Sequence, residues 1–234
     1  MPFHVRSAGA LTGLRAGETV VFTLVVDKKS SWVEDLRVVA FDSAERDPMQ
    51  ASRLKLLESV TGEGSPAALN IGDKVPGFSL IDQNGRQTAL ADFSGKVIAI
   101  NFIYTRCPLP DYCFRLSNNF GRLQKRFAGN RDLVLLTVTF DPVHDQPDVL
   151  ARYAEIWKAD PTMWHFLTGQ VNEVQRVCDL FGVGHWQEEG VFTHSLHTGI
   201  IDREGRLAAN IEGNRFTAQQ LGDLVDSVLK RTRQ

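Results

Sequence analysis

Two continuous apolar runs dominate the hydrophobic pattern of the chain, VIAINFIY at residues 97–104 and LVLLTVTFD at residues 133–141. Unbroken runs rich in β-branched residues are typical of strands buried on both faces of a sheet. A shorter strand-like run lies at 164–168, and segments with apolar residues at helical spacing lie at 114–128, 145–159 and 171–183. This alternation predicts parallel strands joined by right-handed helical crossovers, as in an α/β fold.

Both ends of the chain carry further patterns. Residues 195–213 predict a β-hairpin that turns at Asp202–Gly205, followed by a closing helix at 217–232, and Asn84–Gly85 predicts a two-residue hairpin turn near the start of the same domain. Residues 1–41 hold two strand-like runs separated by the polar residues DKKS. Residues 42–66 are rich in charged and small residues, with a pattern for a short helix at 48–60 and the breaker run TGEGSP. We therefore expect a small β segment at 1–41, a linker at 42–66 and a main domain at 67–234.

Composition and charge narrow the possible functions. Hydrophobic residues make up 43% of the chain and charged residues 23%, as in an ordinary globular protein. The formal net charge of −2 argues against a nucleic-acid partner, which usually needs a basic face. No run approaches the ~18 apolar residues of a membrane span, and the first ten residues lack the charged start and apolar core of a signal peptide.

The candidate chemistry lies in the loop that follows the first apolar run. Cys107 and Cys113 are expected at the carboxyl edge of a central strand, where open α/β sheets bind ligands. A cysteine at a helix start has its thiolate stabilised by the helix dipole, and Arg106 adds a positive neighbour, so the pattern favours a reactive or metal-binding sulfur. A plain disulfide or a pair of inert thiols is the alternative. Cys178 stands alone on the apolar face of the 171–183 segment, which predicts a buried, inert thiol.

Three segments in this order, FIYTRCP at 102–108, TFDPVHDQPDVLARYA at 139–154 and FTHSLHTGIIDREG at 192–205, resemble the Sco/SenC family from about residue 71 to residue 230. The resemblance implies a thioredoxin-like three-layer fold with a central mixed sheet, here preceded by a small all-β segment. It also implies a metallochaperone with copper, Cu(I) or Cu(II), held by Cys107, Cys113 and His194, and thiol-disulfide chemistry at the two cysteines. The family usually has three residues between its cysteines, whereas this chain has five, as in a branch with a CPLP-type loop.

The chemistry of the side chains agrees with this ligand set. Soft thiolates favour Cu(I) and imidazole suits Cu(II), so two cysteines and a histidine can serve both states. Zinc fits this ligand set less well, because a structural zinc site generally takes four ligands and the sequence offers three. Asp141 is a candidate to support the ligands by a hydrogen bond or by its charge, with a helix cap as the alternative. Asp111, between the cysteines, is a candidate for an extra oxygen ligand or a solvated turn residue. His185 is a candidate to reach the cysteine loop, with a solvated loop residue as the alternative. His197 is expected on the other side of its strand and is not a predicted ligand.

The N-terminal segment carries a resemblance of its own. Residues 1–41 are similar to the C-terminal half of small periplasmic copper-binding barrels of the CusF type, with Met1, Pro2 and Phe3 matching the stretch that precedes the strands. The histidine and tryptophan that such barrels place upstream have no counterpart here, so we assign no metal site to this segment.

Three functional hypotheses follow. The first is a copper-binding Sco-type protein that supports assembly of a respiratory oxidase copper site, by delivering copper to the oxidase subunit or by reducing its thiols. The second is a metal-independent thiol-disulfide oxidoreductase or peroxidase-like enzyme, and the third is a redox or copper sensor that acts by binding a partner. The resemblance implies work in the periplasm or another extracytoplasmic place, with or without membrane association, so we expect the natural chain to be longer and exported. We also expect Cys107 and Cys113 to lie close enough to form a disulfide.

Overall fold

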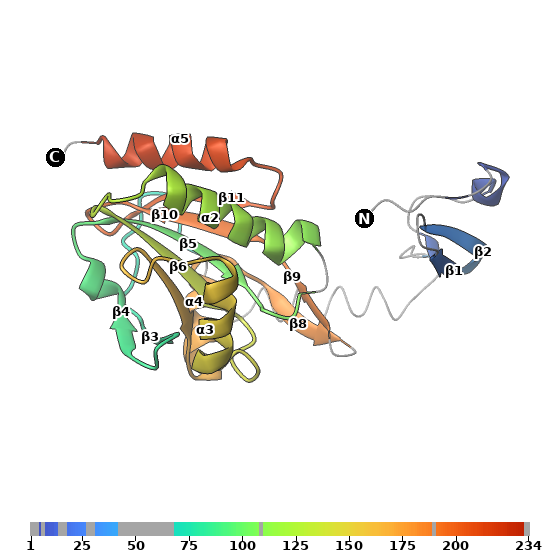
Figure 1. Cartoon of the computed structure of the whole chain (residues 1–234), viewed down its shortest axis with the longest axis horizontal. Helices are drawn as coiled ribbons and strands as arrows, with labels where there is room; N and C mark the ends of the chain where they lie inside the picture. The colour runs from blue at the N-terminus through green and yellow to red at the C-terminus, as the bar shows by residue number, and fades with distance from the viewer. Residues whose placement is uncertain are drawn as a thin grey trace. The chain divides into compact units, whose positions relative to one another are not determined.

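The computed structural model describes residues 5, 8–13, 18–26, 31–41, 68–107, 110–188 and 191–231. The chain divides into two compact units, Met1–Ser65 and Pro66–Gln234, and Figure 1 shows the elements of both. The predicted linker at 42–66, with its short helix, lies outside the described residues. The domain boundaries that the sequence suggests therefore stay predictions.

The N-terminal unit contains a short 3-10 helix, Ala8–Leu11, and an antiparallel hairpin of strands β1 (Glu18–Val26) and β2 (Ser31–Phe41). The two strands match the two strand-like runs of the sequence, and their pairing runs from Glu18 with Phe41 to Val26 with Ser31. Val33 is buried, at 4% exposed. The similarity of this unit to a CusF-type barrel stays a prediction.

The second unit is built on a seven-stranded mixed sheet with the strand order β11-β10-β5-β6-β7-β3-β4. Its strands are β3 (Ser79–Asp82), β4 (Gln87–Ala89), β5 (Val97–Ile103), β6 (Leu133–Thr139), β7 (Trp164–Thr168), β10 (His197–Ile201) and β11 (Leu207–Glu212). Strands β5, β6 and β7 are parallel, whereas β10 joins β5 and β3 joins β7 in antiparallel pairs. Every residue of β5 and β6 is buried, as the two continuous apolar runs predict.

Helices cover both faces of this sheet. They are α2 (Arg115–Arg126), α3 (Pro147–Ile156), α4 (Val171–Leu180) and α5 (Ala218–Leu229), with the short 3-10 helix Leu90–Phe93 before β5. One apolar cluster packs Val97 and Ala99 of β5 against α2, α3 and α5, and a second packs Ile98, Ile100 and Phe102 mainly against α4. The alternation of side chains along a strand produces these two cores. The predicted α/β fold with a central mixed sheet between helix layers is confirmed.

Two local predictions are wrong. The turn at Asn84–Gly85 has three residues rather than two, because the Asp82 N–H bonds the Arg86 carbonyl at 2.8 Å. The Asp82 carboxylate accepts the N–H groups of Asn84 and Arg86, both at 2.8 Å, and Gly85 takes the left-handed φ of +74° that this longer loop requires. The second error concerns residues 182–195, GVGHWQEEGVFTHS, whose glycines predict a loop. They contain the hairpin β8 (His185–Glu188) and β9 (Val191–His194).

Candidate metal centre

The cysteine loop begins where β5 ends. Tyr104 is buried, and a tight turn follows in which the Cys107 N–H bonds the Tyr104 carbonyl at 3.3 Å. Residues 108 and 109 lie outside the described part of the chain. A π-helical turn, Pro110–Phe114, then leads into α2, and Tyr112 within it has the non-helical angles φ −106° and ψ −107°. Cys113 lies in this turn and is buried, at 1% exposed, while Cys107 is half-buried.

His194 reaches the same place from a distant part of the chain. It is the last residue of β9, and its Nε2 lies 3.7 Å from the Cys113 Sγ. One ligand atom from each of Cys107, Cys113 and His194 lies within 4.8 Å of the other two. The structure therefore brings together the three residues that the sequence singled out, although 81 positions separate the second cysteine from the histidine.

The hydrogen bond of the imidazole fixes its tautomer. His194 Nδ1 lies 3.0 Å from the Ser195 carbonyl oxygen. A carbonyl oxygen can only accept, so Nδ1 carries the proton and Nε2 keeps its lone pair on the side of the sulfurs. A backbone carbonyl that orients one ring nitrogen while the other binds metal is a common arrangement in metal sites.

Aromatic rings enclose the histidine. The Phe140 ring centroid lies 4.6 Å from that of His194, and Tyr104 and Tyr112 present edge-on contacts at 5.7 Å and 6.3 Å. His185 pairs with His194 across the β8–β9 hairpin and stacks on Phe140 at 5.2 Å, and burial lowers its pKa. His185 therefore lies beside the site, packed on Phe140. It does not belong to the group of three close donor atoms.

A buried carboxylate that sequence reasoning missed holds the cysteine loop. Asp145 is fully buried and accepts hydrogen bonds from the Thr105 N–H at 3.0 Å, the Thr105 hydroxyl at 2.5 Å and the Thr139 hydroxyl at 2.6 Å. The helical pattern at 145–159 predicts a cap at Asp145 or Gln146, and Gln146 is the N-cap residue of α3. Asp145 instead ties the turn before Cys107 to the end of β6.

Arg106 and Asp141 form the second link between these loops. An Arg106 guanidinium nitrogen lies 2.6 Å from an Asp141 carboxylate oxygen, and this hydrogen bond raises the pKa of Arg106. The side chain of Asp141 is 6% exposed and that of Arg106 is 43% exposed. Asp141 thus supports the loop through its neighbour Arg106, and the alternative of a helix cap is wrong because α3 begins at Pro147 with Gln146 at the cap.

The expectation of an acidic thiol is wrong for Cys113. A hydrogen bond with Cys107 and burial both raise the pKa of the Cys113 thiol. The hydrogen bond with Cys107 and the loss of solvation therefore outweigh the helix dipole and Arg106, which pairs with Asp141. A thiol of raised pKa keeps its proton at neutral pH until a metal ion displaces it.

The donor set itself fits copper. Two sulfurs and one imidazole nitrogen are ligands that Cu(I) and Cu(II) accept, and the half-buried site allows exchange. The carboxylates of Asp141 and Asp145 are engaged with Arg106, Thr105 and Thr139, so they leave the donor set free of hard oxygen ligands. Within the described ranges, this is the one group of at least three histidine, cysteine, aspartate or glutamate side chains close enough to hold a metal ion.

Comparison with known proteins agrees with the fold and the motif order. Residues 68–230, more than half of the chain, match the family model described as SCO1/SenC. The chain belongs to the SCO1/SenC family. Protein sco1 of Schizosaccharomyces pombe is 29% identical over 161 residues, covering 64% of this chain and 59% of that protein. Peroxiredoxin Bcp of Escherichia coli is 32% identical over 148 residues, covering 59% of this chain and 83% of that protein.

Solved structures show the same fold. A SCO1/SenC family lipoprotein from Bacillus anthracis has a TM-score of 0.61 and 23% identity, covering 69% of this chain and 97% of that chain. Yeast Sco1, solved with copper bound, has a TM-score of 0.57 and 24% identity, covering 72% of this chain and 91% of that chain. At these identities the likeness establishes the SCO1/SenC fold alone. The match spans between 49% and 65% of the length of the first four curated relatives.

The remaining predicted residues lie elsewhere in the SCO1/SenC domain. His197 is 9% exposed, its Nδ1 lies 3.4 Å from the Asn210 Oδ1, and it is not part of the donor group, as its place in the strand predicts. Cys178 is fully buried, and burial raises the pKa of its thiol, which agrees with an inert residue. The side chain of Asp111 lies outside what the structure describes, so its role stays a prediction. In the described part of the chain, no helix is both long and apolar enough to cross a membrane.

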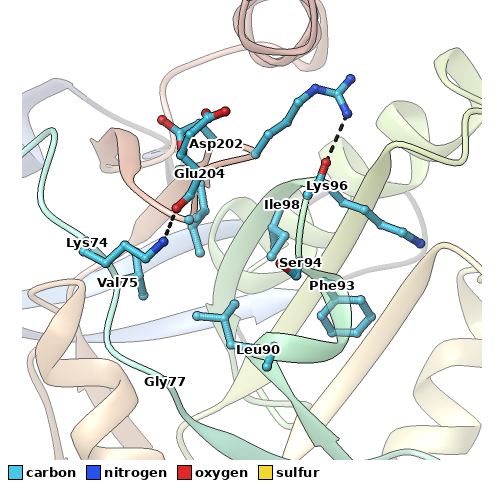
Figure 2. Close-up of a pocket in the computed structure, with 15 residues that line it drawn as sticks. Lys74, Val75, Gly77, Leu90, Phe93, Ser94, Lys96, Ile98, Asp202 and Glu204 are labelled. Carbon is cyan, nitrogen blue, oxygen red and sulfur yellow. Dashed lines mark hydrogen bonds between the residues drawn. The ribbon is translucent and has the colours of Figure 1, made fainter. Parts of the chain in front are cut away.

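A separate cavity of about 270 Å³ lies at the other end of β5 from the cysteines. Its lining includes Ile98 and Ile201, and Figure 2 shows Lys74 reaching toward Glu204, whose backbone carbonyl accepts a hydrogen bond from the Lys74 Nζ. Arg203 and Gly95 also line the cavity, and the Arg203 guanidinium donates a hydrogen bond to the Gly95 carbonyl at 3.2 Å. None of the site residues lines this cavity, so it is distinct from the candidate metal centre.

Proposed function

We propose that this protein binds copper through Cys107, Cys113 and His194 and passes it to the copper site of a respiratory oxidase subunit. The observation that carries the proposal is the cluster of three donor atoms within 4.8 Å, with the imidazole oriented by the Ser195 carbonyl. Yeast Sco1, a relative in fold, has been solved with copper bound, which supports copper as the metal. The ion is cargo rather than a resident cofactor, and three ligands at a half-buried site favour release to a partner.

The cysteine pair also supports thiol-disulfide exchange as a second activity. The two cysteines are not joined in a disulfide, and their sulfurs lie close together. Cys107, the more exposed thiol, attacks a partner disulfide as a thiolate, forms a mixed disulfide and releases one partner thiol. Cys113 then attacks the Cys107 sulfur, so the pair becomes a disulfide and the partner leaves with both of its sulfurs reduced. The two electrons lost by the cysteine pair are those gained by the partner disulfide.

Substitution of the histidine separates these activities. His194→Ala removes one copper ligand and leaves both thiols, so Cu(II) affinity should fall by at least about 100-fold while the rate of thiol exchange changes little. The matched control is His197→Ala, because His197 is close in sequence but bonds Asn210 outside the donor group. Copper titration monitored by absorbance, together with reduction of a model disulfide, measures both quantities. Equal Cu(II) affinity of wild type and His194→Ala would rule out the three-ligand site and leave thiol exchange as the better proposal.

We place this activity outside the cytoplasm. The B. anthracis relative is described as a lipoprotein, and a reversible dithiol is useful where disulfides persist. Fractionation of cells that express the natural gene tests this location, and recovery of the protein in the cytoplasmic fraction would contradict it.

A further inference from the structure

A groove next to the candidate metal centre carries charge that the site itself does not use. The groove has a volume of about 390 Å³ and lies between α2 and the start of α5, helices that run side by side (Figure 1). Phe114, which directly follows Cys113, forms its end nearest the site, and Arg115 and Arg122 line its length. Thr217, the N-cap of α5, lines the opposite wall, so the positive end of that helix also points at the groove.

The two arginines are available for an anionic partner. Helix α2 contains four basic residues and no acidic one (RLSNNFGRLQKR). Within the described ranges only Arg126 of the four forms an ion pair, with Asp223 at 2.7 Å. Among the residues that the structure describes, no carboxylate pairs with Arg115 or Arg122. A local concentration of unpaired guanidinium groups on a chain of net charge −2 is a recognition feature rather than a consequence of composition.

Exposed aromatic rings extend this surface to the metal centre. Phe114 is 55% exposed and Tyr112 is 41% exposed, although Tyr112 also contacts His194 edge-on at 6.3 Å. Large apolar side chains left in water at the mouth of a site are typical of the contact area of a protein partner. A small anion could neutralise the arginines but would leave both rings uncovered.

We propose that the α2–α5 groove, with the Phe114 ring at its end and the Tyr112 ring beside His194, docks an acidic segment of the protein that receives the copper. This inference rests on the proposed function for the identity of the partner. Arg115 and Arg122 are seven residues apart, about 10.5 Å along the helix, so they match two carboxylates at a similar separation on the partner. Bidentate arginine–carboxylate pairs at that spacing orient the partner, and the adjoining rings then cover the entrance beside His194.

The test uses the purified full chain and the isolated copper-binding domain of the oxidase subunit from the same organism as the probe. Arg115→Glu with Arg122→Glu reverses the charge of the groove, and Arg115→Gln with Arg122→Gln only neutralises it. The matched control is Lys125→Glu with Arg131→Glu, which makes the same change in net charge at exposed positions that do not line the groove. Circular dichroism and thermal unfolding confirm that each variant is folded.

The dissociation constant and the rate of Cu(I) transfer are measured at low salt, about 20 mM, and at about 500 mM, where surface charges are largely screened. At low salt the reversed groove should weaken binding at least about 10-fold, the neutral groove less, and the control about twofold or less, because association is steered by charge. The difference between groove variant and control should shrink at high salt.

Any other outcome of these measurements contradicts either the docking groove or the proposed function. Equal binding by groove variant and control, or no binding by the wild type, overturns the docking groove. So does a result in which inorganic phosphate binds the groove while the oxidase domain does not. Binding that depends on the groove without any copper transfer leaves the groove standing and sinks the proposed function. Copper transfer at the same rate by the groove variant and the control contradicts the docking groove and leaves the proposed function standing.

Discussion

Asp145→Ala should destabilise the protein and loosen the metal centre together. The buried carboxylate accepts from the Thr105 N–H, the Thr105 hydroxyl and the Thr139 hydroxyl, and the substitution removes all three bonds. The Thr105 N–H left without a partner costs about 1–3 kcal/mol, and each of the two lost hydroxyl bonds costs about 1 kcal/mol, because a hydroxyl can rotate toward another acceptor. We therefore expect the free energy of unfolding to fall by about 3–5 kcal/mol. Copper affinity should fall as well, because Thr105 leads directly into Arg106 and Cys107.

Two further variants isolate this cause. In Asp145→Asn one amide oxygen can still accept the Thr105 N–H and the amide NH₂ can donate to a threonine oxygen, so the expected loss is about 1–2 kcal/mol. Asp148→Ala removes an exposed carboxylate three positions along the chain, whose pairing with Arg152 at 2.9 Å contributes about 0.5 kcal/mol or less. Urea unfolding gives the free energies, and copper titration gives the affinity. An Asp145→Ala protein as stable as Asp148→Ala would refute the assignment of Asp145 as the anchor of the loop.

Three other predictions test the fold and the thiols. Gly199→Ala should cost about 1–3 kcal/mol in urea unfolding, because a Cβ there would lie 2.7 Å from a phenyl carbon, whereas Gly77→Ala, with open space, should be nearly neutral. Iodoacetamide at neutral pH should modify Cys107 before Cys113, since burial and a raised pKa protect Cys113. Mass spectrometry of the digested protein measures the order, and earlier modification of Cys113 would contradict the prediction. Burial lowers the pKa of His197 in the folded state, so the unfolded chain binds more protons below about pH 6.5. Stability should therefore fall from pH 7 to pH 5, and less so in His197→Gln, while an identical pH dependence in both proteins would contradict this reading.

The core of the fold was predictable because its strands are buried on both faces. The runs at 97–104 and 133–141 are continuous and apolar since helices cover each side of the sheet, and the structure has β5 and β6 within them. The hairpin that ends at His194 was not predictable in the same way. Its first strand follows Gly182 and Gly184, which read as loop signals, and no long apolar alternation marks the pairing of His185 with His194.

In the candidate site, too, some residues could be predicted from the local sequence and others could not. Cys107 and Cys113 could be placed at the edge of the sheet from local sequence, whereas His194 was selected by its motif, since distance along the chain gives no measure of distance in space. Asp145 was missed because a single charged residue before a helix looks like a cap, and its real partners come from the end of another strand. The acidic thiol was wrongly expected because dipole and charge arguments are local, whereas the burial of Cys113 depends on the tertiary packing.

The central claim is that one copper ion is held by two cysteine sulfurs and one histidine nitrogen. X-ray absorption of the copper-loaded protein measures this ligand set directly. The account predicts a copper shell with sulfur from Cys107 and Cys113 and one imidazole nitrogen, and the loss of the imidazole signal in His194→Ala with the sulfur signal retained. An imidazole signal that persists in His194→Ala, or a shell without sulfur in the wild-type protein, would contradict it.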